Sequence, residues 1–311
     1  MHTRNASSPL IETLAGLLET NLSAAACAER RLPDAILMCQ PTYFDVLDVK
    51  NSFMTGNIDC VDKSLAIKQW QRLKSTIEDL GFPVKTVSAV PGLEDMVFSA
   101  NQGLIGSDSN GSAFFIPGKM RHDSRQREVP HYTSWFESNG YAIIPLAYDT
   151  ISDESVYFEG HGDAIWHHGK NLLWGGFGHR TSKNAYRLLS ARLDCPIVLL
   201  ELVNPTFYHL DTAFCVLDND NVLYYPQAFS EDGQRLIREL FPWTIQAEEK
   251  EAHNFACNAL ALGKNVLIEK DNHITCSSLE ARGFQPVEVD TCEFMKSGGS
   301  VFCLKTQIHS T

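Results

Sequence analysis

The sequence predicts an α/β fold assembled from small units in which strands and one helix alternate. Five times along the 311-residue chain, a helical pattern ends at Gly or Pro and an apolar strand pattern follows within a few residues. Gly adopts the left-handed conformation that ends many helices, and Pro cannot continue one. No linker rich in Pro, Gly or Ser divides the chain after residue 33. We therefore expect a single main domain.

The first expected element is an amphipathic, alanine-rich helix over residues 10–31. Pro33 and Asp34 follow, and the apolar run 35–39 is typical of a buried strand. Residues 1–32 are therefore expected to form a helical arm added to the main domain, which comprises residues 33–311. We expect the helix of this arm to pack on the domain, and binding of a partner is the less favoured alternative.

The five joins between helix and strand follow in order along the rest of the chain. They lie near residues 80–85, 139–144, 194–200, 240–245 and 282–289. Short strand patterns with turn signals lie between them, for example at 213–217 and 222–225. A unit of strand, strand, helix and strand is too small to bury its own apolar face, so several units would share one core. An ordinary three-layer α/β domain gives the same alternation, and periodicity alone does not separate the two.

The charge balance excludes some classes of partner. The chain has 26 Lys and Arg against 38 Asp and Glu, a net charge of -12. Nucleic acids and anionic membranes are bound through basic surfaces, so neither is an expected partner. The acidic balance would attract small cations such as guanidinium compounds, although a role in solubility explains it equally well. A homo-oligomer is compatible with the sequence.

Cysteine usage and the absence of targeting segments favour a soluble cytoplasmic protein. No two of the nine Cys are spaced as in C-x-x-C, and an odd number of scattered thiols fits a reducing compartment. Glu12 and Glu19 interrupt the apolar stretch near the start of the chain, which a secretory signal would not allow. No apolar run reaches the length of about 18 residues that a membrane-spanning helix needs.

Segments dense in Gly and polar residues are the first candidates for a functional site, because such residues gather where strands end in loops. Residues 158–163 place Glu159 and Asp163 among glycines, which let a ligand approach the backbone. Paired acids can hold a cation, although a plain polar turn explains this segment equally well. Residues 92–101, which include Asp95 and Asn101, say little in isolation.

Two further segments carry an imidazole and a thiol. His209 and Asp211 are two residues apart, so on a strand they would face the same side and the carboxylate would favour imidazolium. Cys303 follows the turn at Gly298 and Gly299 and begins a short final strand, where a nucleophile can be exposed and firmly held. We expect the other thiols to be ordinary buried or surface residues.

Motifs for cofactors and metals are weak. Residues 175–178 are rich in Gly but lack the spacing of a dinucleotide fingerprint and the Lys of a phosphate loop. His161, His167 and His168 do not form a known zinc frame, so surface histidines are the favoured interpretation. We expect no cofactor and no metal.

Taken together and in this order, the segments resemble the guanidine-modifying superfamily, which includes amidinotransferases and dimethylarginine dimethylaminohydrolases. The resemblance spans about residues 35–308 and leaves the arm outside it. The matching segments are 38–41 with Phe44, Val46 and Asn51, then 95–101, 125–128, 158–163, 178–181, 208–212 and 297–304.

The resemblance implies a fold and a chemistry. The fold is a five-bladed α/β propeller (pentein) of pseudo-repeated ββαβ units around one central site. In the implied mechanism Cys303 attacks the guanidinium carbon as thiolate, while His209 protonates the leaving amine and later activates water. Guanidinium is a poor electrophile, so it needs both a strong nucleophile and a proton donor. The thiolate in turn needs a cationic neighbour or the charge of the substrate.

The resemblance also assigns the residues that hold the substrate, L-arginine or a close relative. Glu159 matches the acid that binds guanidinium nitrogens. Asp95, Asp163 and Asp211 match acids that support the substrate or the histidine. Arg125 and Arg180 match the arginines that clamp the α-carboxylate, a natural bidentate partner.

One departure points within the superfamily to arginine dihydrolases. Ala100 and Asn101 stand where methylarginine hydrolases carry a Glu-Asp pair, and Asn51 and Asn101 resemble the two asparagines of bacterial arginine dihydrolases. An amide can donate and accept, so it can hold a neutral ureido intermediate for a second hydrolysis. The segment 51–54 departs from the usual Asn-Pro-Trp-Met. The remaining alternatives are an arginine deiminase or dimethylarginine hydrolase that yields citrulline, an amidinotransferase, and a binding module on the same fold.

Overall fold

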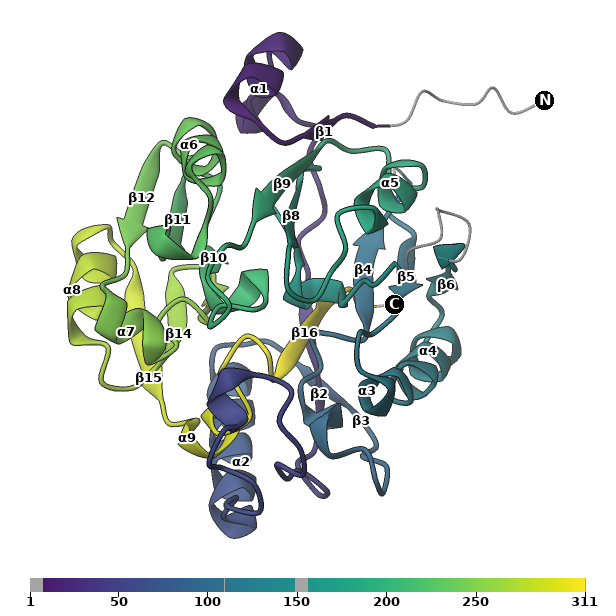
Figure 1. Ribbon diagram of the computed structural model, residues 1–311, viewed down its shortest axis with the longest axis vertical. Helices are drawn as coiled ribbons and strands as arrows, with labels where there is room; N and C mark the ends of the chain where they lie inside the picture. The colour runs from purple at the N-terminus through teal and green to yellow at the C-terminus, as the bar shows by residue number, and fades with distance from the viewer. Residues whose placement is uncertain (1–7, 109, 149–155, 311) are drawn as a thin grey trace.

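The structure is a computed structural model that describes residues 8–108, 110–148 and 156–310. Figure 1 shows strands around the middle of the molecule and most of the helices at its periphery. The α-helices are α1 (Leu14–Thr20), α2 (Lys63–Asp79), α3 (Asp123–Gln126), α4 (Val129–Ser138), α5 (Ala185–Ser190), α6 (Glu231–Leu240), α7 (Glu249–His253), α8 (His273–Ala281) and α9 (Cys292–Met295).

The strands of the described residues form five separate sheets. In chain order they are β1 (Leu10–Ile11), β2 (Ala35–Cys39), β3 (Val84–Val87), β4 (Gly103–Ser107), β5 (Ala113–Pro117), β6 (Ala142–Ile143), β7 (Ala164–Trp166), β8 (Leu173–Phe177), β9 (Ile197–Glu201), β10 (Phe214–Val216), β11 (Asn221–Tyr224), β12 (Trp243–Gln246), β13 (Leu260–Leu262), β14 (Asn265–Glu269), β15 (Gln285–Val289) and β16 (Lys305–Ile308). A mixed α/β fold is therefore confirmed.

Each sheet repeats one connection rule. An antiparallel pair comes first, a helix follows the second strand, and the chain then returns to add a strand parallel to that second strand. Three sheets are built from consecutive strands, namely β4-β5-β6, β10-β11-β12 and β13-β14-β15, and a fourth adds β1 to the consecutive strands β7-β8-β9. The fifth, β16-β2-β3, takes its first strand from the C-terminal end of the chain. All five predicted helix-to-strand joins are found, at α2-β3, α4-β6, α5-β9, α6-β12 and α8-β15.

The predicted continuous helix over residues 10–31 is wrong. Leu10 and Ile11 instead form β1, which pairs in parallel with the edge of β9. The side chain of Thr13 caps α1, and Asn21 ends that helix in the left-handed conformation at φ 49°. The apolar side chain of Ile11 is therefore buried as part of a strand, and it does not form the apolar face of a helix.

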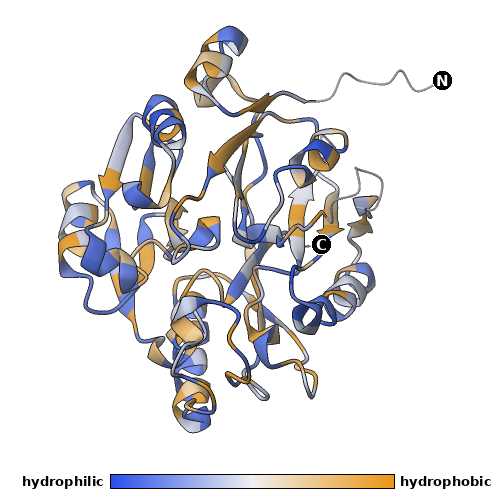
Figure 2. Cartoon of the chain, viewed as in Figure 1, coloured by the Kyte–Doolittle hydropathy of each residue, from blue (hydrophilic) through white to orange (hydrophobic). Residues whose placement is uncertain are grey.

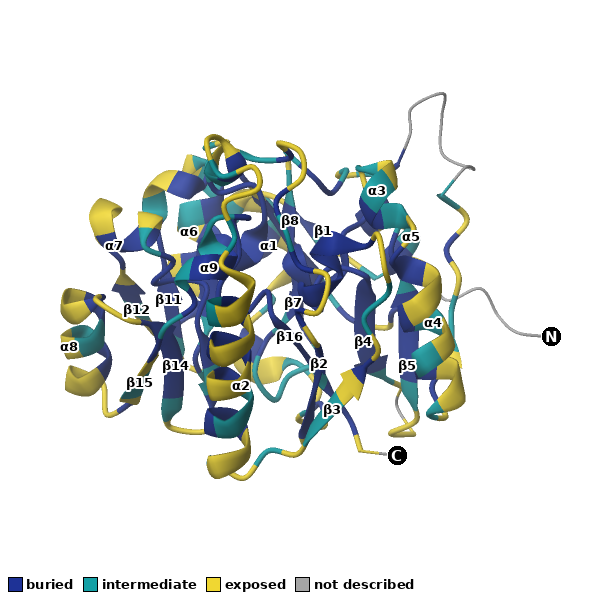
Figure 3. Ribbon diagram, turned by 90° about the horizontal axis from the view of Figure 1, so that it is seen from below, coloured by how far each residue is buried: buried dark blue, intermediate teal, exposed yellow. Residues whose placement is uncertain are grey.

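Burial follows from the arrangement of helices outside and strands inside. The outward faces of α2, α4 and α8 carry the exposed residues in Figure 3, and the strands between them are largely buried. Strand β9 is hydrophobic over most of its length (Figure 2), as expected of a strand with neighbours on both sides. None of the described helices is both long and apolar enough to cross a lipid bilayer.

Candidate active site

Four of the ten predicted site residues occupy equivalent places in successive units. They lie within three residues before the first strand of the repeated unit: Asn101 before β4, Asp163 before β7, Asp211 before β10 and Cys303 before β16. Asn258 occupies the same place before β13. The repeated connection therefore delivers one polar side chain per sheet to a common region.

A small pocket collects most of the predicted site residues. Its volume is about 20 Å³, which is space for about one water molecule. Seven of the ten predicted residues line it: Asn51, Asp95, Asn101, Arg125, Arg180, His209 and Cys303. The other three, Glu159, Asp163 and Asp211, are fully buried beside these residues. In this state the pocket has no room for a molecule as large as arginine.

The thiol of Cys303 is buried and hydrogen-bonded. Its Sγ donates to Oδ2 of Asp211 at 3.2 Å and accepts from Nδ2 of Asn258 at 3.2 Å. Burial, reinforced by the Asp211 carboxylate, raises the pKa of Cys303 well above its usual range. Burial also raises the pKa of Asp211, to about 7. In this structure the thiol therefore keeps its proton and donates it in a hydrogen bond to the Asp211 carboxyl group.

Asn258 was missed at the level of the sequence. Its Oδ1 accepts from the backbone N–H groups of Ser300, Phe302 and Cys303 at 3.1, 3.1 and 3.3 Å, and its Nδ2 also donates to the carbonyl of Asp211. One side chain therefore fixes the loop that carries the thiol. No glycine flags this position, and its only sequence signal is its place before a first strand.

His209 lies between two buried carboxylates. Its Nε2 donates to Oε2 of Glu159 at 2.7 Å and lies 3.9 Å from Oδ2 of Asp163. Burial opposes the charge of Glu159, but Arg180 and His209 outweigh it and hold the pKa of Glu159 well below its usual range. The predicted acid and the predicted proton donor are thus in direct contact.

The two predicted clamp arginines are engaged within the protein. Nη1 of Arg180 donates to Oε2 of Glu159 at 3.1 Å, and its guanidinium carbon lies 4.7 Å from the ring centre of Tyr208. Nη2 of Arg125 donates to Oε2 of Glu128 at 3.1 Å. Both arginines line the pocket, but neither is held free for a carboxylate in this state. Their role as a clamp stays a prediction.

Two other residues that line the pocket, Asp95 and Asn51, are held by different partners. Oδ2 of Asp95 lies 3.1 Å from Nζ of Lys50, a buried cation that sequence reasoning did not identify. Oδ1 of Asn51 accepts from the backbone N–H of Phe53, and its Nδ2 donates to the carbonyl of Ser297. Asn51 therefore ties its loop to the segment that leads to Cys303.

The side-chain amide of Asn101 uses only one of its two polar atoms in hydrogen bonds to the described residues. Its Oδ1 accepts from Nη1 of Arg125 at 3.0 Å, and its buried Nδ2 has no hydrogen-bond partner in the described part of the chain. Gly162 packs directly against this amide, since a Cβ on Gly162 would clash with Nδ2. An unpaired donor therefore lies in the wall of the pocket.

Comparisons with known proteins agree with this chemistry. The family "N,N dimethylarginine dimethylhydrolase, eukaryotic" matches residues 43–310. An uncharacterised protein of Caenorhabditis elegans is 38% identical over 92% of this chain and 98% of its own length. The dimethylarginine dimethylaminohydrolase of Mycobacterium tuberculosis is 37% identical over 88% of this chain and 85% of its own length.

A further relative is only partly covered. The bifunctional arginine dihydrolase/ornithine cyclodeaminase ArgZ of Synechocystis is 35% identical over 88% of this chain, which spans 37% of that protein. The structure of the N-terminal domain of ArgZ bound to its substrate matches with a TM-score of 0.83 and 34% identity, over 89% of this chain and 98% of that domain.

The fold, the buried thiol with its imidazole and carboxylates, and these relatives define a guanidine-modifying hydrolase. More particularly, the chain belongs to the dimethylarginine dimethylaminohydrolase family, whose model matches residues 43–310.

Proposed function

We propose that the protein is an arginine dihydrolase, which converts L-arginine and two water molecules to ornithine, carbon dioxide and two molecules of ammonia. The N-terminal domain of ArgZ, an arginine dihydrolase, supports this assignment through its similarity over 89% of the chain. We further propose that the five sheets are the blades of an α/β propeller with one central site, formed by residues 33–311. The nine free thiols support a cytoplasmic location.

The first chemical step in this proposal forms a bond between sulfur and carbon. As the guanidinium enters, the Cys303 thiol passes its proton to Asp211, whose Oδ2 already accepts it, and Sγ attacks the guanidinium carbon. His209 protonates the departing nitrogen, which leaves as ammonia. The product of the step is a cationic thiouronium on Cys303. The charge of the substrate stabilises the thiolate, whereas burial of the site alone disfavours it.

In the second step His209 takes a proton from water, and hydroxide attacks the thiouronium carbon. The carbon–sulfur bond breaks and the thiol is regenerated. The immediate product is citrulline, whose neutral ureido group then undergoes the same thiol chemistry once more. Loss of the second ammonia and a second hydrolysis give a carbamate, which decomposes to ornithine and carbon dioxide.

The unpaired Nδ2 of Asn101 is the observation that carries the assignment as a dihydrolase. A ureido oxygen accepts hydrogen bonds and a guanidinium does not, so this donor favours retention of citrulline for the second round. A carboxylate at the same position would have no donor to offer. We therefore expect Asn101→Asp to keep the first reaction and to weaken the second.

The internal ion pairs indicate how the substrate would be seated. In this structure the guanidinium of Arg180 pairs with Glu159, the acid predicted to bind the guanidinium of the substrate. Arginine would displace it, and Arg180 would then be free to pair with the α-carboxylate. The guanidinium of the substrate would thus take the place of the Arg180 guanidinium beside Glu159. The buried Glu159 carboxylate would keep a cationic partner throughout.

The test is an assay of the products formed by the purified protein from L-arginine. We expect ornithine and ammonia at about one to two without an added acceptor amine, and for Asn101→Asp we expect citrulline to accumulate. The inactive control is Cys303→Ser. Citrulline as the sole wild-type product would contradict the dihydrolase assignment, and a requirement for an acceptor amine would indicate an amidinotransferase. Dimethylarginine as the better substrate would favour the second candidate, a methylarginine hydrolase.

A further inference from the structure

A larger cavity lies apart from the candidate active site. Its volume is about 260 Å³, and no residue that lines it lines the pocket around Cys303. Its walls come from β4, β7, β10, β13 and β16, together with the segment between α1 and β2. It reaches the surface beside Leu32, which is 44% exposed.

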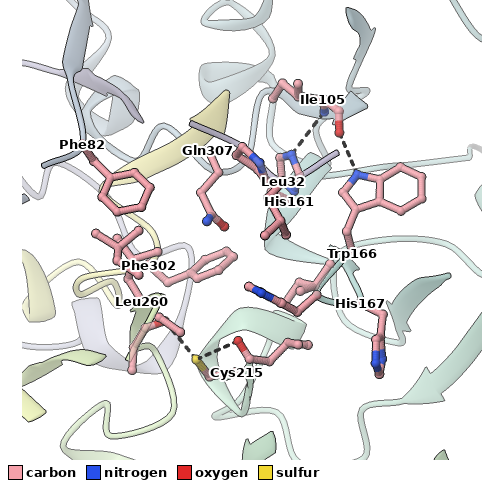
Figure 4. A pocket seen from close by; sticks show the side chains of 18 of the residues that line it. Leu32, Phe82, Ile105, His161, Trp166, His167, Cys215, Leu260, Phe302 and Gln307 are labelled. Atoms are coloured by element: carbon pink, nitrogen blue, oxygen red, sulfur yellow. Dashed lines mark hydrogen bonds between the residues drawn. The ribbon is translucent and has the colours of Figure 1, made fainter. Parts of the chain in front are cut away.

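The cavity is mainly apolar. Figure 4 shows Phe82, Leu260 and Phe302 on one side and Trp166 on the other, and the amide of Gln307 lies among them. Among the described residues no Asp or Glu lines it. Apolar walls with a few placed polar groups are typical of sites for small organic ligands.

One wall residue, Arg30, is a buried cation that has no ion-pair partner among the described residues. Arg30 is 9% exposed, and its Nε and Nη2 atoms have no hydrogen-bond partner in the described part of the chain. Its guanidinium carbon lies 4.1 Å from the ring centre of Trp166. The charged neighbours of Arg30 in the sequence, by contrast, are exposed and form ion pairs: Glu29 with Lys170, and Arg31 with Asp34. A buried charge without a counter-ion is costly, so an anion from outside the chain would stabilise it.

The histidines in the wall do not compete for that anion. Nδ1 of His161 donates to the carbonyl of Ala164, and its Nε2 accepts from the backbone N–H of Ile105. Burial lowers the pKa of His161 to about 3 and also lowers the pKa of His167 and of His168, the third histidine in the wall. The three rings are therefore neutral, and Arg30 is the one positive charge among the described residues that line the cavity.

We propose that this cavity is a second binding site, which takes a small ligand with one carboxylate and an apolar body. The carboxylate pairs with the Arg30 guanidinium after a small shift of that side chain, and the apolar body lies against Phe302 and Leu260. Guanidinium is well suited to a carboxylate because two N–H groups can donate in parallel. The cavity volume, below that of most drug-sized sites, limits the ligand to a few carbon atoms.

The test is calorimetric titration of the whole protein with hexanoate and with its neutral isostere hexanamide. We expect saturable binding of hexanoate and binding of hexanamide that is at least tenfold weaker. Arg30→Met should weaken hexanoate binding at least tenfold, while the matched control Arg31→Met should leave it unchanged, because Arg31 lies outside the cavity. Equal binding of the acid and the amide would overturn the proposal.

Two further measurements keep the proposal testable. The first does not depend on the folding of Arg30→Met, and the second shows whether hexanoate binds at the candidate active site instead. Gln307→Trp, which fills the cavity without touching the charge, should also abolish binding. In the Cys303→Ser protein saturated with arginine, hexanoate affinity should be unchanged, because the two sites share no residue. Competition with arginine, or unchanged binding in Gln307→Trp, would place hexanoate elsewhere and contradict the proposal.

Discussion

At the scale of single residues, the position and the protonation of the candidate nucleophile, Cys303, are set by the side chains that contact its sulfur. Cys303 is 3% exposed, and its sulfur contacts both a carboxylate and an amide. Asn258 provides that amide and also binds three backbone N–H groups of the loop. The thiol is thus positioned before substrate arrives, which lowers the entropic cost of the reaction.

This role of Asn258 predicts the effect of Asn258→Asp. The carboxylate would keep the three backbone hydrogen bonds but would replace a donor to Sγ with a negative charge. We expect the pKa of Cys303 to rise further and kcat/KM to fall by at least about tenfold, since each pKa unit corresponds to about 1.4 kcal/mol. The pH dependence of alkylation by iodoacetamide measures the shift directly. Wild-type alkylation and activity in Asn258→Asp would refute this role.

At the scale of elements, the short segments before the first strands must approach one another closely. Gly160 begins the 3-10 helix 160–162 before β7 with φ at 55°. A Cβ at this position would clash with the carbonyl oxygen of Gly103 and would lie 2.6 Å from its nitrogen. Both contacts are with backbone, so no side-chain rotation can relieve them. Glu159 is therefore placed by a backbone contact that requires glycine.

We accordingly expect Gly160→Ala to lower the free energy of unfolding by about 3 kcal/mol or more and to reduce activity sharply. The matched control is Gly233→Ala in α6, where the added Cβ meets its nearest atom at 3.4 Å. Because Ala favours helix, that control should change stability by no more than about 1 kcal/mol. Urea unfolding of the two variants checks the difference, and equal stabilities would contradict it.

The elements also show where sequence reasoning succeeded and failed. The joins were predictable because Gly or Pro marks each one locally, as at Gly81 and Gly283. The structure of residues 10–31 was not, because Leu10 and Ile11 fit an apolar helical face as well as a strand, and only the edge of β9 decides between them. Asn258 was missed because its importance comes from contacts with residues more than 40 positions away.

At the scale of the whole molecule, burial leaves several ionisable groups far from their ordinary titration range. Burial raises the pKa of Glu269 to about 7, as it does for Glu128 and Asp211. The folded protein then holds protons that the unfolded chain has lost, so these acids reduce stability as pH rises from about 4.5 to 7. His161, with its lowered pKa, acts in the opposite direction over part of that range.

A comparison of wild type with Glu269→Gln isolates one of these contributions. The amide introduced by this substitution does not ionise, so the variant should escape the loss that wild type suffers between about pH 5 and pH 7.5. We expect the stability of the variant relative to wild type to increase over that interval by up to about 3 kcal/mol. Urea unfolding at both pH values provides the measurement, and a difference that does not change with pH would disprove the prediction.

The most direct test of the proposed mechanism is to trap the covalent intermediate on Cys303. The His209→Gly variant can be incubated with S-methyl-L-thiocitrulline, whose methylthiolate leaves without the proton donor that an amine requires. Mass spectrometry of the intact protein and of its peptides then locates any adduct. We predict a mass increase equal to the substrate less methanethiol on the peptide that contains Cys303, and no adduct in the Cys303→Ser form of the variant. An adduct on another residue, or none under conditions in which the wild-type protein consumes the substrate, would contradict the mechanism.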